Sequence, residues 1–176
     1  MNHLATSKED ILAASRDLIK ENGWAAVSIR AVASRCSVSA GTIYNYYESK
    51  ADLLSDTIES IWHEIFFHPE DEQVFHDVES CISWIYERLE YGNRQFPGFF
   101  SLHSFGFMRD EKTSGKKRMM KTWGHILNGL CEVLENDPKV RADVFDQEFT
   151  EKKFADILFS LILVSMIRQD YDPSSV

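Results

Sequence analysis

The chain has 176 residues, a formal net charge of −9 at pH 7, 44% hydrophobic residues, 8 glycines and 4 prolines. This length suits one compact unit or two small ones, and the composition argues against a disordered chain. Three widely spaced cysteines, Cys36, Cys81 and Cys131, exclude a disulfide framework and a CxxC metal pair, so we expect a reducing, cytoplasmic location. We expect no signal peptide and no membrane partner, because no apolar run is long enough to span a bilayer.

The negative charge is unevenly distributed along the chain. Residues 1–50 carry six basic and five acidic side chains, whereas the remainder carries 13 basic and 23 acidic ones. An acidic body repels phosphate, so a polyanionic partner is expected to dock on the N-terminal part of the chain.

The first helix is predicted between Ser7 and Gly23. Thr6 or Ser7 can cap its N-terminus, and acidic residues in the first turn favour the positive end of the helix dipole. Its inner face is an apolar stripe at helical spacing, formed by Ile11, Ala14, Leu18 and Ile19. Gly23 suits the left-handed position that ends a helix.

The stretch Ser28–Leu53 predicts two short helices joined by a tight turn, followed by the start of a longer helix. Ser39 is a suitable N-cap for the second helix. Ile43 and Tyr47, four residues apart, share the face that docks on the first helix. The other faces of the second helix carry hydroxyls, an amide and aromatic rings, and no acid. Such a pair of helices predicts a helix-turn-helix, a motif that places its second helix in the DNA major groove.

The rest of the chain is also predicted to be helical, which makes the fold all-α. The expected segments are a capped helix over Lys50–Phe66, a periodic helix from Val74 to Leu89, a short aromatic helix over Phe99–Met108, a helix over Lys116–Glu135, a short helix over Val140–Asp146 and a last helix over Phe149–Arg168. We divide the chain into a helix-turn-helix domain, residues 1–49, and a helical effector-binding and dimerisation domain, residues 50–176. The second half of the last helix is apolar on nearly every face, which predicts cover from a partner subunit.

The segment VSIRAVASRCSVSAGTIYNYYESKADLL, residues 27–54, closely resembles the N-terminal DNA-binding signature of TetR-type transcriptional regulators. The pattern Val38-Ser39-x-Gly41-Thr42-Ile43-Tyr44-x-Tyr46-Tyr47, with Lys50, carries the resemblance. It covers residues 7 to about 66; beyond about residue 70 only the helical layout matches. The resemblance implies a sequence-specific transcriptional regulator, a ligand-responsive homodimeric repressor that binds a palindromic double-stranded DNA operator.

The resemblance also implies which residues touch DNA. The contacts to bases and phosphates would come from Arg30, Thr42, Tyr44, Asn45 and Tyr46. Lys50 would anchor a phosphate, aided by the N-terminus of its helix. The family pattern also places Ser28, Ser39 and Ala40 beside the DNA. Tyr47 is expected to pack in the core.

A cavity in the C-terminal bundle is a further implication of the resemblance, and its ligand would be a small apolar or aromatic molecule. The candidate lining consists of aromatic residues and a histidine: Trp62, Phe66, Trp84, Phe99, Phe100, His103, Phe107 and Trp123. His125 is a second candidate for a polar group in this cavity. For each aromatic residue the alternative is an ordinary place in the core. The dimer would pair the last two long helices with their copies through Trp123, Leu127, Leu130, Leu158, Leu161, Ile162 and Ser165.

Other classes of site find little support in the sequence. His63 and His68 are five residues apart, whereas a helical zinc motif needs a spacing of four, so we expect no metal and no cofactor. The basic cluster from Lys116 to Lys121 is interpreted as a solvated helix face. No nucleophile elbow, phosphate loop or dinucleotide fingerprint is present, so we expect no enzyme. The alternative function is a helical protein-interaction module without specific DNA binding.

Overall fold

The computed structural model describes residues 6–66, 75–100, 114–141 and 143–175. Every regular element within these ranges is helical, which confirms the predicted all-α class. The elements are α1 (Lys8–Asn22), η1 (Trp24–Ala26), α2 (Ile29–Arg35), α3 (Ala40–Tyr44), α4 (Lys50–Phe66), α5 (Val78–Gln95), α7 (Ser114–Asn136), α8 (Glu151–Arg168) and η3 (Pro173–Ser175).

Side-chain caps begin most of the helices, and those of α1, α3 and α4 were predicted from the sequence. Ser7 and Asp10 form a capping box at α1, in which each side chain accepts a hydrogen bond from the other residue's backbone N–H. Gly23 ends α1 with a φ of 77°. Asp77 caps α5 and Thr150 caps α8.

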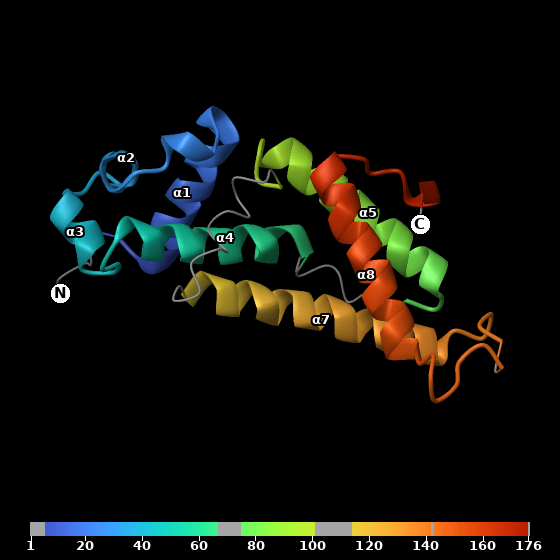
Figure 1. Cartoon of the computed structure of the whole chain (residues 1–176). Helices are drawn as coiled ribbons and strands as arrows, with labels where there is room; N and C mark the ends of the chain where they lie inside the picture. The colour runs from blue at the N-terminus through green and yellow to red at the C-terminus, as the bar shows by residue number, and fades with distance from the viewer. Residues whose placement is uncertain (1–5, 67–74, 101–113, 142, 176) are drawn as a thin grey trace.

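Helix α4 runs from the small N-terminal unit into the C-terminal bundle (Figure 1). It packs against α1 on the N-terminal side and against α5 and α7 in the bundle. Leu53, Ile61 and Ile65 on α4 are fully buried, so this helix contributes to the cores of both parts. Helix α8 packs against α7 and forms an outer layer of the bundle.

Helices α4 and α5 approach each other closely at Gly92. A methyl group on Gly92 would lie 2.6 Å from Cδ1 of Ile65 and 3.0 Å from Cζ of Phe100. Both neighbours are buried, so the absence of a side chain at Gly92 sets the separation of the two helices.

The structure corrects the predicted segment between the last two long helices. The described residues from Val140 to Asp146 form turns and bends, so the short helix predicted there was wrong. The carboxylate of Asp146 accepts hydrogen bonds from the N–H groups of Glu148 and Phe149, which favours a turn over a helix. Helix α7 begins at Ser114, earlier than predicted. Val74 and most of the predicted aromatic helix lie outside the described residues; Phe99 and Phe100 are in a turn.

Candidate functional site

The helix-turn-helix is held by a turn that reverses the chain between α2 and α3. The Ser28 hydroxyl caps α2 by accepting from the N–H of Ala31 at 3.1 Å. At the other end Ser37 takes a left-handed φ of 56°, and the Val38 N–H then donates to the Ala33 carbonyl at 2.9 Å. This geometry fixes the direction in which α3 leaves α2.

Helix α3 is short and is anchored from one side. The Ser39 hydroxyl caps it by accepting from the Thr42 N–H at 3.2 Å. Ile43 and Tyr47 are both buried beneath α3, as their four-residue spacing predicts. With these two side chains anchored, the remaining faces of α3 point to solvent.

The outward face of α3 carries the groups expected to read DNA. Tyr44 is 55% exposed, although its ring is large and apolar, and Asn45 beside it is also exposed. Thr42 is half-buried, with its hydroxyl 3.1 Å from that of Ser39. Arg30 on α2 and Lys50 at the start of α4 are exposed, and neither forms an ion pair within the described part of the chain. These cations are therefore available to phosphate.

Two of the predicted contact residues are less accessible than the others. Tyr46 is half-buried, packs against the core and donates its hydroxyl to the Thr6 carbonyl at 2.6 Å. Ala40 is also half-buried against the core. The Tyr46 hydroxyl thus ties the segment before α1 to the residues that follow α3.

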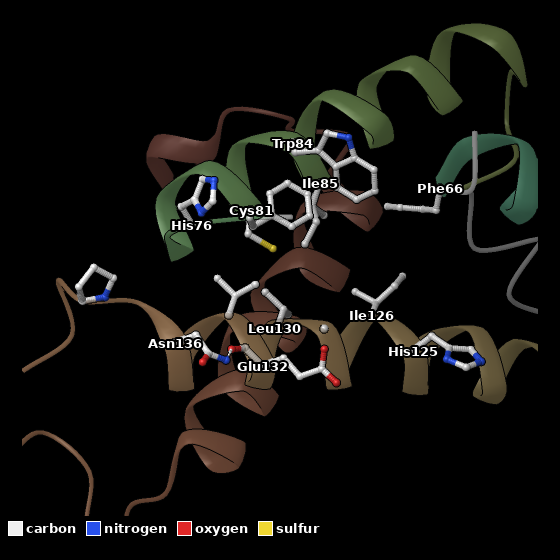
Figure 2. Close-up of a pocket in the computed structure, with 14 residues that line it drawn as sticks. Phe66, His76, Cys81, Trp84, Ile85, His125, Ile126, Leu130, Glu132 and Asn136 are labelled. Atoms are coloured by element: carbon white, nitrogen blue, oxygen red, sulfur yellow. Dashed lines mark hydrogen bonds between the residues drawn. The ribbon is translucent and has the colours of Figure 1, made fainter. Parts of the chain in front are cut away.

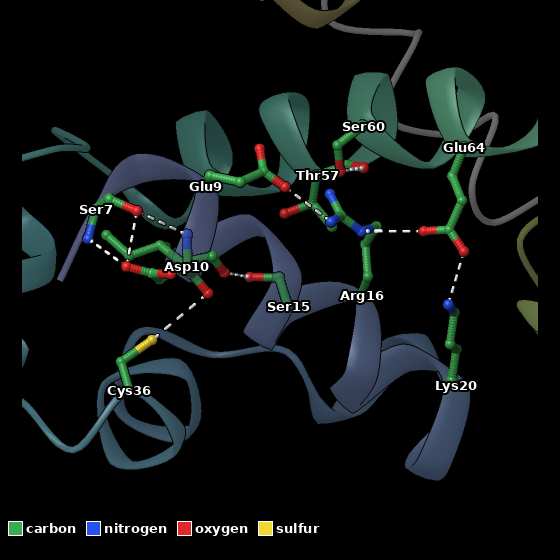
Figure 3. A network of polar contacts seen from close by, with 11 residues as sticks. Ser7, Glu9, Asp10, Ser15, Arg16, Lys20, Cys36, Thr57, Ser60 and Glu64 are labelled. Atoms are coloured by element: carbon green, nitrogen blue, oxygen red, sulfur yellow. Dashed lines mark hydrogen bonds and ion pairs between the residues drawn. The ribbon is translucent and has the colours of Figure 1, made fainter. Parts of the chain in front are cut away.

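Ion pairs join α4 to α1, and Figure 3 shows those that Glu64 forms with Arg16 and Lys20. Near the C-terminal end of α4, Glu64 accepts from Lys20 at 2.6 Å and from Arg16 at 3.1 Å. At the other end, Lys8 pairs with the buried carboxylate of Asp56 at 2.5 Å. These ion pairs hold the N-terminal unit to α4 at both ends of their contact.

Arg88 on α5 binds the backbone at the same end of α4. Its guanidinium donates to the backbone carbonyl of Ile65 and, at 3.1 Å, to that of Glu64. Carbonyls in the last turn of a helix lack intrahelical partners, and a cation there also suits the helix dipole. The end of α4 is therefore bonded to α1 through the Glu64 side chain and to α5 through the Glu64 backbone.

A cavity of about 740 Å³ lies between α5 and α7, next to this end of α4 (Figure 2). Its lining comprises aromatic and aliphatic side chains with a few polar ones: Phe66, Phe75, His76, Cys81, Trp84, Ile85, His125, Ile126, Gly129, Leu130, Glu132, Val133, Asn136 and Pro138. Burial raises the pKa of the Cys81 thiol to about 11, so it stays neutral at physiological pH. Size and lining are those of a small-molecule site.

The predicted lining and the observed one overlap in part. Phe66, Trp84 and His125 line the cavity. His103 and Phe107 lie outside the described residues. The other predicted residues pack elsewhere: Trp62, Phe99 and Phe100 form a buried cluster with ring centroids 5.2–5.6 Å apart, and Trp123 stacks edge-on against Phe159 at 5.7 Å.

Several lining residues were not predicted, and most of them carried a signal. Cys81 and Ile85 on α5, and Ile126 and Leu130 on α7, belong to apolar stripes at helical spacing, and Leu130 was predicted for the dimer interface; Val133 was not singled out. His76, Glu132 and Asn136 have no local signal, because only the packing of α5 against α7 brings them to one place.

The residues predicted for a dimer interface fall into two groups. Leu130, Leu158, Ile162 and Ser165 are buried within the chain, and Ser165 shares a 2.8 Å hydrogen bond with Tyr86. Trp123 and Leu127 are half-buried. Leu161 is exposed, in a stripe on α8 with Ile157, Val164 and Ile167, each 40–49% accessible.

No three His, Cys, Asp or Glu side chains in the described ranges gather into a group that could hold a metal ion. None of the described helices combines the length and apolar character that crossing a membrane requires.

The N-terminal unit matches a known family. Residues 11–57 match the family model described as bacterial regulatory proteins, tetR family. The HTH-type transcriptional regulator UidR of Escherichia coli strain K12 is 38% identical over 48 residues, which are 27% of this chain and 24% of UidR. The match thus spans about a quarter of that relative's length.

Solved structures resemble the chain over nearly its whole length. A transcriptional regulator from Rhodococcus sp. Rha1 has a TM-score of 0.67 at 18% identity and covers 97% of this chain and 87% of its own. A TetR transcription regulator from Haloarcula marismortui gives 0.66 at 20% identity, covering 94% and 88%. FadR from Bacillus subtilis in complex with stearoyl-CoA gives 0.64 at 17% identity, covering 96% and 92%. At these identities the likeness concerns the fold.

Proposed function

We propose that this chain, whose residues 11–57 match the model of the tetR family of bacterial regulatory proteins, is a ligand-responsive homodimeric repressor that binds a palindromic operator. The observation that carries the proposal is the geometry of α3. Its buried Ile43 and Tyr47 anchor a short capped helix, and its exposed Tyr44 and Asn45 face solvent. A helix presented in this way fits the major groove, about 12 Å wide, where side-chain donors and acceptors distinguish base pairs.

We propose that one set of residues contacts the bases and that another set binds the phosphates and positions the protein. Asn45 and Tyr44 are proposed to contact base edges, with Thr42 at the first turn of α3. Arg30 and Lys50 are proposed to bind phosphates, because both are exposed cations beside α3 and are free of ion pairs among the described residues. Ser28, Ser39, Ala40 and Tyr46 complete the proposed set; Ser28 and Ser39 already cap helices, and the Tyr46 hydroxyl is bonded within the chain.

The dimer is proposed to form through the exposed apolar stripe of α8. Ile157, Leu161, Val164 and Ile167 follow helical spacing on one face, and an exposed apolar stripe of this kind marks an interaction site. A two-fold pairing of α8 with its copy, flanked by α7, would cover it. Such a dimer would present two α3 helices to successive major grooves, about 34–36 Å apart.

The effector is proposed to bind in the cavity between α5 and α7 and to act through α4. Phe66, in the last turn of α4, lines the cavity, and Arg88 joins that turn to α5. Glu64 in the same turn carries the ion pairs to Arg16 and Lys20 of α1. A ligand that binds one placement of α4 more tightly than another would shift the population of α1–α3 orientations and so the operator affinity. The stearoyl-CoA complex of FadR supports the view that this fold accommodates ligands.

Selection of bound duplexes from random DNA tests the proposal most directly. We expect an inverted repeat whose half-sites lie about 10 base pairs apart, centre to centre. Lys50→Ala should reduce the salt slope of binding by about 1 per subunit and weaken all sequences alike. Arg94→Ala, which removes an exposed cation on α5, serves as the control. Recovery of no enriched sequence, with no salt-dependent binding, would leave the helical interaction module as the better description.

The dimer has its own test. Leu161→Glu places a charge in the proposed interface of both subunits and should give monomers in sedimentation experiments at micromolar concentration. Gln95→Glu adds the same charge at an exposed site on α5 and should leave the dimer intact. If Leu161→Glu forms a dimer as stable as that of Gln95→Glu, the dimer interface does not lie on α8.

A further inference from the structure

The cavity between α5 and α7 has an aromatic end. The ring centroid of Trp84 lies 5.9 Å from that of Phe66, with the rings nearly perpendicular, and 5.2 Å from that of Phe75. All three rings line the cavity, and Figure 2 shows Trp84 and Phe66 close together, with His76 near the N-terminal end of α5. Aromatic faces carry a negative quadrupole, so a group of rings around one space attracts cations as well as apolar groups.

The α7 wall of the cavity consists of two rows. Ile126, Leu130 and Val133 form the apolar row. His125, Gly129, Glu132 and Asn136 recur at the neighbouring helical spacing and form a polar row along the accessible edge. Gly129 leaves a gap in this row, because a methyl group there would meet no atom within 4 Å. A ligand can therefore lie against α7 with a polar group next to Glu132.

The charge of the described lining is negative. Glu132 is its one formal charge at neutral pH, and no lysine or arginine occurs among the lining residues that the structure describes. Two bases adjacent to the lining are already bonded: Lys139 pairs with Asp77 at 2.8 Å, and Arg88 holds the α4 carbonyls. Residues 51–176 as a whole also carry excess acid. The electrostatic field of the acidic residues 51–176 and the negative charge of the lining both favour a positively charged ligand.

We propose that the effector is an amphipathic organic cation, with an aromatic or branched apolar body and an ammonium or similar group. Its body would fill the space between Trp84 and the apolar row of α7, and its charge would lie between the aromatic rings and the Glu132 carboxylate. This inference rests on the effector role proposed above for the cavity. A fatty acyl anion is the disfavoured alternative, since its carboxylate would meet Glu132 with no compensating base in the described lining.

Two probes of the same shape and opposite charge test the sign of the preference. Tetraphenylphosphonium and tetraphenylborate are titrated by calorimetry into the full chain at pH 7, with palmitate as the acyl anion. We expect saturable binding of tetraphenylphosphonium, at least tenfold tighter than that of tetraphenylborate or palmitate. Quenching of tryptophan fluorescence should accompany it and should diminish in Trp84→Phe, because Trp84 lines the cavity.

Matched variants place the probe in the cavity. Glu132→Gln should weaken tetraphenylphosphonium binding by roughly fivefold, the size expected for a charge pair exposed to water. Glu135→Gln changes the net charge equally on the same helix but outside the lining, and should leave binding unchanged. Gly129→Leu should abolish binding by filling the gap, whereas Gly129→Ala should retain it. Circular dichroism verifies that each variant is folded.

The remaining outcomes overturn the inference. Equal or tighter binding of tetraphenylborate or palmitate would show that the cavity does not select cations. Binding that survives Gly129→Leu, or that Glu135→Gln weakens as much as Glu132→Gln, would place the probe elsewhere. Absence of saturable binding by all three probes would also reject the cation. Operator binding by the ligand-free chain is measured separately, so it reports on the proposed regulator whatever the probes show.

Discussion

Replacing Gly92 by alanine should destabilise the protein, although the same change in an open helix stabilises. Alanine in a helix interior is favoured over glycine by about 0.5–1 kcal/mol. At Gly92 the new methyl would lie 2.6 Å from Cδ1 of Ile65 and 3.0 Å from Cζ of Phe100, both buried. Overpacking of this kind costs about 1–3 kcal/mol. The difference predicts a net loss of about 1–2 kcal/mol.

Gly129→Ala is the matched control for this prediction. It makes the same change in the interior of α7, where the methyl would meet no atom within 4 Å. This variant should gain about 0.5–1 kcal/mol, so the two variants should differ by roughly 1.5–3 kcal/mol. Urea unfolding followed by helical circular dichroism measures the difference. All proteins are compared at one concentration, because self-association would contribute to the apparent stability.

The reasoning fails if Gly92→Ala is as stable as Gly129→Ala. That result would mean that α4 and α5 can separate by a few tenths of an ångström at no cost. The shape of the α4–α5 contact would then not depend on the missing side chain. An unchanged slope of stability against urea is required for the comparison, because a changed slope signals an altered unfolded state or the loss of two-state unfolding.

Three other substitutions test separate features. Ser37→Gly should stabilise by about 0.5–1 kcal/mol in thermal unfolding, because glycine adopts the left-handed φ of 56° without strain; a loss would show that the turn relaxes in solution. Tyr86→Phe leaves the buried Ser165 hydroxyl unbonded and should cost about 1 kcal/mol in urea unfolding, whereas no change would indicate that water replaces the phenol. Lys139 holds the pKa of the Asp77 carboxylate well below its ordinary value, so its contribution is present above about pH 4 and is lost as the pH falls further. The urea midpoint of wild type should therefore fall more steeply on acidification than that of Asp77→Asn, and parallel curves would contradict the pairing.

The local signals in the sequence predicted the N-terminal unit well. Ser39 and Ser49 lie at the starts of their helices, and Ile43 and Tyr47 are buried at the spacing that one helix face requires. These features depend on residues within a few positions of one another. The sequence was a poorer guide to which of the predicted contact residues have side chains free to bind DNA. Tyr46 reaches the Thr6 carbonyl, 40 residues away, and no local pattern reports that bond.

The cavity was less predictable because it depends on which helices become neighbours. Trp62, Phe99 and Phe100 have the residue type of a binding site but fill the space beside α4 with one another. The observed lining instead takes Trp84 from α5 and Glu132 from α7. Residue type identifies candidates, whereas the packing of α5 against α7 decides which of them face an open space.

In the last helix, too, the sequence alone does not show which side chains are buried. Its second half is apolar all round, so periodicity does not distinguish the inward stripe from the outward one. The structure places Leu158 and Ile162 inside and Leu161 outside. Neighbouring positions on such a helix have equal hydrophobicity, and only the packing against α7 and α5 separates them.

The shared position of α4 has a consequence for chimeric proteins. A cut between residues 49 and 50 would separate α1 from the buried Leu53 and Ile61 of α4. It would also leave Lys8 without Asp56 and Lys20 without Glu64, and Arg16 would keep only Glu9 of its two acidic partners. A graft intended to transfer operator preference to another body should therefore carry α4 along with α1–α3. The junction with the recipient then falls at the C-terminal end of α4, where Arg88 donates to the Glu64 carbonyl. The recipient must therefore supply an arginine on its own α5 that can form the same hydrogen bond.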